Sequence, residues 1–163
     1  MSDLQEKIRN AIAPCSLCCY TCPAKRNGMI AQTAGTLLHY LEGYPDFRRA
    51  VIPEKNRTSD GKIAEFLERL EKYSRPTCDG CRVGTHGSCC ISGCLIRECT
   101  QAHHVDFCAE CEEFPCGKLT EEVFHPTVIQ EWKDGNERIR VVGIEQYFKE
   151  ITAQSHYLPF QKK

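Results

Sequence analysis

Cysteine is the residue type that most constrains this chain. It occurs 13 times, and nine of these cysteines lie between residues 78 and 116. The first part of that segment, residues 78–90, contains three glycines and a single valine and has no hydrophobic period, so it cannot build an apolar core of its own. We therefore expect bonds to sulfur, rather than apolar packing, to order the segment.

The spacing of the sulfurs favours metal ligation over disulfide bonds. The pairs Cys78-x2-Cys81 and Cys108-x2-Cys111 can each fold as a knuckle that turns two thiolates toward one tetrahedral ion. Thiolates select zinc or iron–sulfur clusters over magnesium or calcium. An odd number of cysteines would leave one unpaired in a disulfide framework, and the charged first ten residues lack the apolar stretch of a secretion signal. We expect a cytoplasmic protein that holds two or more zinc ions.

Metal would decide whether this segment is ordered at all. Structural zinc contributes about 10–16 kcal/mol of apparent binding energy in small peptides. That range is similar to the whole net stability of an ordinary domain, about 5–15 kcal/mol. The expected fold class is therefore mainly α, with an irregular metal-stabilised cysteine-rich segment of zinc-knuckle or treble-clef-like loops and little β structure.

Length and charge limit the other possibilities. A chain of 163 residues fits one domain, residues 1–163, with cysteine-rich segments 15–22 and 78–116 packed on helices. No apolar run approaches the roughly 18 residues that span a bilayer, so we expect no membrane association. The formal charge is −1, from 21 Lys plus Arg against 22 Asp plus Glu, and each zinc held by four thiolates makes it more negative. Nucleic-acid binders usually carry a basic excess, so a nucleic-acid partner is not expected; a protein partner and the oligomeric state stay open.

Outside the cysteine clusters, apolar residues recur every three or four positions and predict helices. The first expected helix begins at Ser2, in a capping box with Gln5, and the next covers 29–41. A short helix is expected from Pro45, a longer one from Asp60 to before Pro76, and one to two turns within 94–104. The last two are a stretch from Thr120 that Pro126 interrupts or restarts and a final helix through Ile139 and Ile151. Between the last two, Asp134-Gly-Asn136 is predicted to be a turn and cap.

A second cysteine cluster occupies residues 15–22. It can be divided as Cys15-x3-Cys19-x2-Cys22 with Cys18 extra, or as two adjoining C-x-x-C pairs. The first spacing is the one with which radical S-adenosylmethionine enzymes hold a four-iron cluster, but those enzymes require a barrel of repeated βα units, and no such alternation follows Cys22. Two alternatives stay open. Either Cys15, Cys19 and Cys22 hold an iron–sulfur cluster with a redox or catalytic role, or they complete a zinc site with ligands from residues 78–116.

The remaining candidate groups give no catalytic pattern. The vicinal pairs Cys18-Cys19 and Cys89-Cys90 each leave a spare sulfur, which is a buried apolar group or an exchangeable thiol; the latter would suit metal buffering or transfer. His39 is expected to be an ordinary helix histidine, while His103 and His104 are possible nitrogen ligands that the many nearby thiolates disfavour. His86 lies between glycines in a loop that could reach an open coordination position. Phe107 and Phe114 flank residues 108–116 and are expected to shield the site from solvent. The sequence contains no P-loop, GxSxG or HExxH motif, so we do not expect an enzyme.

Three stretches taken together resemble a known family. They are Cys94-Leu-Ile-Arg-Glu-Cys99, the run from Cys108 to Leu119, and the closing run from Asn136 to Phe148. The chain resembles the small cysteine-rich prokaryotic proteins grouped as domain of unknown function 3795, which are often labelled zinc-binding. The resemblance implies a mostly helical, cytosolic, metal-binding protein without an established activity.

Carried over by position, the resemblance gives a set of matching metal-ligand cysteines. These are Cys15, Cys19, Cys22, Cys78, Cys81, Cys94, Cys99, Cys108, Cys111 and Cys116. The family has a further cysteine two residues before the equivalent of Cys94, whereas three residues separate Cys90 from Cys94 here. We take Cys90 as the ligand, with Cys89 as the open alternative.

Overall fold

The computed structural model describes residues 2–83, 94–155 and 157–161, and these residues are mainly helical, as the sequence predicts. The α-helices are α1 Asp3–Ala11, α2 Met29–Tyr40, α3 Tyr44–Val51, α4 Asp60–Ser74, α5 Ile96–Ala102, α6 Pro126–Val142 and α7 Ile144–Thr152, with short 3-10 turns η1 Glu54–Asn56, η2 Cys108–Glu110 and η3 Leu158–Phe160. Within this described part, β structure is limited to isolated bridges between Ile12 and Cys18 and between Lys25 and Cys78. The expectation of little β structure is therefore confirmed for these residues.

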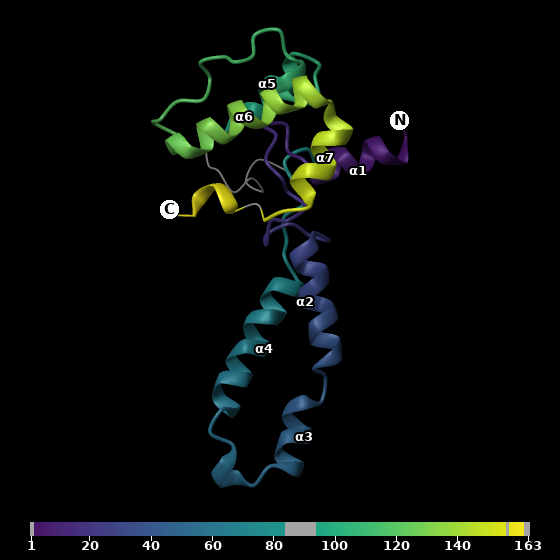
Figure 1. The fold of residues 1–163 in the computed structure, drawn as a ribbon, viewed down its shortest axis with the longest axis vertical. Coiled ribbons are helices and arrows are strands. Elements are labelled where there is room, and N and C mark those ends of the chain that lie inside the picture. Colours follow the sequence, from purple (N-terminus) through teal and green to yellow (C-terminus); the bar gives the residue numbers. More distant parts are fainter. Residues whose placement is uncertain (1, 84–93, 156, 162–163) are drawn as a thin grey trace.

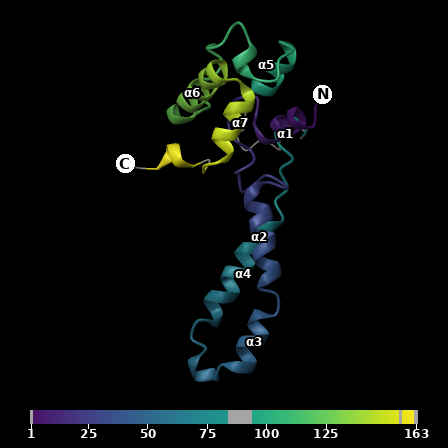
Figure 2. The same ribbon diagram turned by 45° about the vertical axis from the view of Figure 1, so that its right-hand side comes forward.

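The helices form two parts (Figures 1 and 2). We call residues 29–75 the arm, in which α2 packs along α4, with α3 at its far end against α4. The described residues before and after the arm form the body, which contains α1, α5, α6, α7 and both chain ends. The arm projects away from the body in both views, so the cysteine-rich segments lie in the body and at the base of the arm.

Two apolar clusters form the core of the body. The first packs α1 and α7 around the loop that enters η2 and consists of Ile8, Ala11, Ile12, Phe107, Ala109, Ile139 and Tyr147. The second consists of Ile96, Cys108, Phe114 and Trp132, with further cysteines packed against it. Because α6 supplies Ile139 to the first cluster and Trp132 to the second, this helix connects both halves of the core.

Local sequence explains most helix boundaries. Ser2 and Gln5 form the predicted capping box at the start of α1, with Ser2 N donating to Gln5 Oε1 at 3.0 Å. Pro126 begins α6, as predicted, with His125 as the capping residue. The stretch from Thr120 to Phe124 forms turns rather than the predicted helix. Its backbone bonds from Val123 N and Phe124 N to Thr120 O, at 3.2 and 3.0 Å, close one turn. Pro126 prevents this turn from growing, because proline has no N–H to donate.

The predicted turn at Asp134-Gly-Asn136 is wrong, because α6 runs unbroken through these residues to Val142. The break comes instead at Gly143, whose φ of 79° is a left-handed conformation that glycine adopts without strain. Glycine and asparagine favour turns in isolation, yet here tertiary contacts use both residues inside the helix. The predicted final helix is consequently divided between the end of α6 and α7.

Part of the predicted metal segment lies outside the described residues. His86, Cys89 and Cys90 fall within 84–93, so neither their roles nor the knuckle or treble-clef form of this stretch is tested. Among the described residues, none of the helices combines the length and apolar character that a membrane crossing requires.

Candidate metal centre

The predicted ligands of the amino-terminal cluster gather around one cavity with two from the later segment. We call Cys15, Cys18, Cys19, Cys22, Cys81 and Cys94 the first thiol group; all six line a cavity of about 70 Å³. The other walls are mainly apolar side chains from α5, from residues 119–128 and from Trp132 of α6. The sequence alone left open whether the two cysteine segments meet, and the fold brings them together.

Backbone hydrogen bonds create this arrangement. The chain reverses at Ser16, which has a φ of 70°, and the turn is closed by Ala13 N donating to Leu17 O at 2.8 Å. At the base of the arm, Cys78 N donates to Ala24 O at 3.0 Å, and Arg26 N donates to Cys78 O at 2.8 Å. These bonds join the chain entering the arm to the chain leaving it, and so place residues 78–81 beside residues 19–25.

Four further cysteines form a second thiol group, Cys99, Cys108, Cys111 and Cys116. Cys108, Cys111 and Cys116 belong to or pack against the apolar cluster around Trp132. Cys99, on α5, lines a cavity of about 180 Å³ together with Cys108 and Cys116. Three of the four thiols thus share one cavity, and Cys111 packs against the neighbouring apolar cluster without lining that cavity.

Trp132 lies between the two thiol groups, since its side chain lines both cavities. The residue is only 1% exposed, and its indole Nε1 has no hydrogen-bond partner within the described part of the chain. The ring packs edge-on against Phe114, with 5.0 Å between ring centroids. A buried N–H without an acceptor is costly. The nearby Cys108 sulfur, whose pKa the indole lowers, would become a stronger acceptor for this N–H as a thiolate.

The thiols at the centre of each group are strongly perturbed. Burial raises the pKa of Cys15 well above its ordinary value, and repulsion from Cys81, Cys94 and Cys108 adds to that rise. Burial likewise raises the pKa of Cys108 to about 11, which the Trp132 indole partly offsets. Without a cation these sulfurs therefore stay protonated at neutral pH. A bound metal ion supplies the positive charge that thiolates in such surroundings need.

Two arginines fix the backbone around the thiol groups. Arg140 of α6 donates to Ala109 O and Cys111 O at 2.7 Å each and to Phe114 O at 3.2 Å, and its guanidinium lies 4.8 Å from the centre of the Phe114 ring. This residue thereby holds the loop that carries the second thiol group.

Arg82 has the corresponding role beside the first thiol group. It donates to Arg9 O at 2.8 Å and also to Ile12 O and Asp106 O, while its guanidinium lies 4.7 Å from the centre of the Phe107 ring. Burial lowers the pKa of Arg82, and attraction to the Asp106 carboxylate, with smaller contributions from the Cys19 and Cys15 sulfurs, opposes that change. Phe107 and Phe114, predicted to shield the site, are both buried beneath these arginines.

Asn136 is a positioning residue that the sequence analysis missed. It is fully buried, its Oδ1 accepts a hydrogen bond from Ala109 N at 2.8 Å, and its Nδ2 donates to Trp132 O at 2.8 Å. The neighbouring Gly135 allows close approach, because a Cβ there would lie 2.9 Å from Ser16 Cβ. The sequence signal for this role was a polar residue within an otherwise amphipathic helix. It was missed because glycine and asparagine locally favour turns.

Two other candidate ligands, Cys78 and His103, lie at the edges of the thiol groups. Cys78 lies next to the first thiol group in the chain, and Gly80 N donates to its Sγ at 3.4 Å, but Cys78 does not line that cavity. His103 lies at the edge of the second group, where Lys118 Nζ is 3.4 Å from its Nε2 and 3.3 Å from Cys99 Sγ. Among the residues that the structure describes, no three cysteine, histidine or carboxylate side chains already form a group that could hold a metal ion. Metal binding thus stays a prediction.

Comparison with known proteins places the chain in a family but assigns no activity. A search of curated proteins and of solved structures found no significant match. A family model matches residues 11–121, which include both thiol groups and the whole arm but not α6 or α7. The closing stretch from Asn136 to Phe148, part of the resemblance seen in the sequence, therefore lies beyond the matched residues. The chain belongs to the family described as Protein of unknown function (DUF3795).

Proposed function

We propose that the protein is a small metal-binding module in which cysteine thiolates hold zinc. The second thiol group carries this proposal. It offers four sulfurs, which is the ligand number of structural zinc, gathered around the apolar cluster that contains Trp132. Zinc held by four thiolates has no open position for chemistry, so the metal would fix the irregular loop 108–116 against α5 and α6.

The surroundings of the second group fit a negatively charged zinc–thiolate site. The ammonium of Lys118 lies 3.3 Å from Cys99 Sγ, and this contact raises the pKa of Lys118. The buried Trp132 indole N–H interacts with the Cys108 sulfur and lowers its pKa, and among the described residues it has no other acceptor. Both groups can donate to sulfur, and donors of this kind commonly stabilise metal-bound thiolates and orient them.

Elemental analysis and an absorption spectrum, taken on one sample purified without oxygen, test the proposal. Two or more zinc ions per chain and no visible absorption are expected. Cys108→Ser and Cys111→Ser should each release the zinc of the second group and lower the melting temperature. The matched control is Cys18→Ala, which removes a buried sulfur outside the second group. If both serine variants keep the full metal content and melting temperature, the assignment is wrong.

A second candidate concerns the first thiol group alone. Six sulfurs line its cavity, which is more than one tetrahedral zinc takes, and a cavity of about 70 Å³ exceeds the roughly 10–15 Å³ that one water needs. These observations favour a cofactor with several metal atoms, such as an iron–sulfur cluster held by Cys15, Cys19 and Cys22. Iron with sulfide, a broad visible band and quenched Trp132 fluorescence would support the cluster.

Metal buffering or transfer would leave a different signature. It requires at least one ion that exchanges readily, so a chelator of micromolar affinity should then remove part of the zinc without unfolding the protein. A closed structural site gives up its zinc only as the loop unfolds. Chelator competition followed by Trp132 fluorescence distinguishes these two roles.

A further inference from the structure

The arm leaves much of its apolar surface uncovered. Ala31 and Ala34 of α2 are buried, but no residue of α3 or α4 is. Two packed helices bury a single seam between them, and isolated helices shorter than about 12–15 residues are only marginally stable in water. The projection of the arm from the body (Figures 1 and 2) means that the body does not cover α3 or most of α4.

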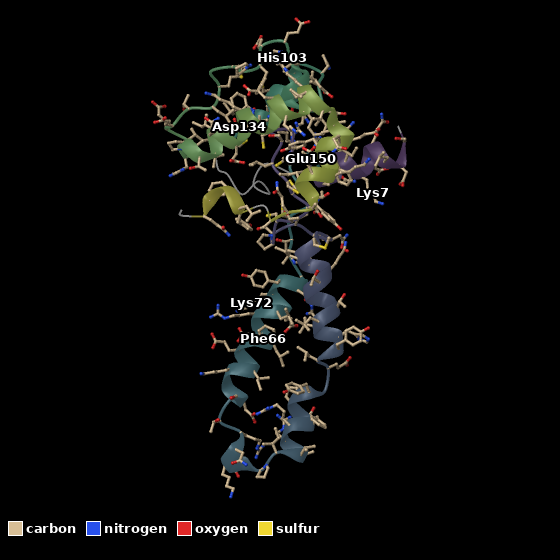
Figure 3. The ribbon with its side chains drawn as sticks, in the orientation of Figure 1. Lys7, Phe66, Lys72, His103, Asp134 and Glu150 are labelled. Atoms are coloured by element: carbon tan, nitrogen blue, oxygen red, sulfur yellow. The ribbon has the colours of Figure 1, made fainter. Side chains whose placement is uncertain are left out.

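Phe47 and Val51 of α3 are exposed at the far end of the arm. The exposed large apolar side chains of α2 and α4 share one side of the arm, which we call the arm face. It consists of Met29, Thr33, Leu37 and Tyr40 on α2 and of Phe66, Leu70 and Tyr73 on α4. Five of the seven line an open groove of about 250 Å³ between the two helices. Tyr40 follows Leu37 by three residues and Phe66 precedes Leu70 by four, so both extend the same stripe. Figure 3 marks Phe66 on α4, well away from the body.

The arm face is almost free of charge. Helix α2 contains no Asp, Glu, Lys or Arg. Six charged residues of α4 and its end pair along the helix, in Glu65–Arg69 at 2.7 Å, Glu68–Lys72 at 2.8 Å and Glu71–Arg75 at 3.1 Å. Asp60 pairs with Arg48 of α3 at 2.9 Å, and Lys62, four residues before Phe66, is the charged residue at the end of the stripe. Residues 29–75 carry eight Lys plus Arg and seven Asp plus Glu, a difference of only one. The net charges of two arms are therefore too small for strong repulsion between them. The arm face also carries no charge cluster that would favour a highly charged partner.

The exposed apolar area matches what a dimer requires. Tyr40, Phe66 and Tyr73 are 79%, 48% and 50% exposed; with about 200 Å² per aromatic side chain, they leave about 350 Å² uncovered. Met29 and Leu37, 42% and 40% exposed, add on the order of 100 Å². A standard interface takes about 800 Å² from each partner, of which about 57% is non-polar, or about 450 Å².

We propose that two copies of this chain associate through the arm face. Helices α2 and α4 of one copy pack against the same helices of the other and complete a four-helix bundle, in which the groove residues become core. The pairing is self-complementary, as expected for a two-fold dimer. The dimer carries one body at each arm and does not depend on which metal the thiols bind.

Sedimentation equilibrium of the protein as purified, from about 1 to 100 μM, tests the proposal. A dimer is expected, and Phe66→Glu should weaken it about 30-fold or more, as for a central interface residue. The control is Val141→Glu, which places the same charge on α6 of the body at a side chain that is 76% exposed. Tyr40→Glu is a second variant that changes a side chain with few contacts in its own copy and should also weaken the dimer.

Hydrogen exchange adds a readout within the native chain. Amide protection in α2 and α4 should rise with protein concentration, while protection in α6 should not change. A wild-type protein that stays monomeric at the highest concentration overturns the proposal and would leave the groove to an amphipathic helix of another protein. A dimer that withstands both Phe66→Glu and Tyr40→Glu overturns it as well, because the copies would then meet elsewhere.

Discussion

Asn136 is the buried amide that couples α6 to the second thiol group, and its removal should be costly. Its Oδ1 accepts from Ala109 N at 2.8 Å, and Ala109 is itself buried. Asn136→Ala leaves that N–H without an acceptor, which costs about 1–3 kcal/mol, and the small cavity left by the amide adds about 1 kcal/mol. We expect the free energy of unfolding to fall by about 2–4 kcal/mol.

Urea unfolding followed by tryptophan fluorescence measures this loss, because Trp132 is the only tryptophan in the chain and is buried. The matched control is Gln130→Ala on the same helix. Its exposed amide bonds to Asp134, and its loss should change stability by no more than about 0.5 kcal/mol. Since Ala109 directly follows Cys108, Asn136→Ala should also release zinc at a lower chelator concentration. If the two variants unfold at the same urea concentration, Asn136 does not have the role assigned here.

Gly135→Ala and Tyr147→Phe test the contacts that α6 and α7 make with the turn at Ser16. Gly135→Ala should destabilise the protein by about 1–3 kcal/mol, because the new Cβ would lie 2.9 Å from Ser16 Cβ. The control is Gly61→Ala on α4, where a new Cβ meets nothing within 4 Å and should stabilise the protein by up to about 1 kcal/mol. Thermal melts compare the two variants. Burial raises the pKa of Tyr147 to about 12 from 10.0, so the folded state keeps a proton that the unfolded state loses and stability falls as pH rises from about 10 to 12. Tyr147→Phe should reduce this alkaline decline in urea midpoints, and an unchanged decline would contradict the burial of the phenol.

Helices whose signals are local could be predicted from sequence. The capping box of Ser2 and Gln5, the apolar period of α2 and α4, and the restart at Pro126 each depend on residues within one or two turns of the chain. The same local reasoning failed at Gly135 and Asn136. Their preference for turns is outweighed by contacts with Ser16 and Ala109, which are distant in sequence.

The candidate site was predictable in composition but not in grouping. Spacing marked the cysteines as candidate ligands, which stays a prediction, and it could not show that Cys81 and Cys94 line the same cavity as Cys15. That arrangement depends on backbone pairing at the base of the arm and on the position of α6. The roles of Arg82 and Arg140 were equally hidden, because an arginine that donates to distant carbonyl groups has no local pattern.

A cation lies beside each of the two thiol groups, whose cavities share Trp132 as a wall. A zinc ion with four thiolates carries a net charge of −2. The pKa of Cys15 is raised mainly by burial, and repulsion from Cys108 of the other group adds to that rise. Two such sites on either side of Trp132 would therefore oppose each other's formation. Arg82 beside the first group and Lys118 beside the second supply compensating charge. Arg82 is half-buried and bonded to three backbone carbonyls, so solvent screens its charge less than that of the exposed Lys118. It should therefore favour metal loading of the first group more strongly than Lys118 favours loading of the second.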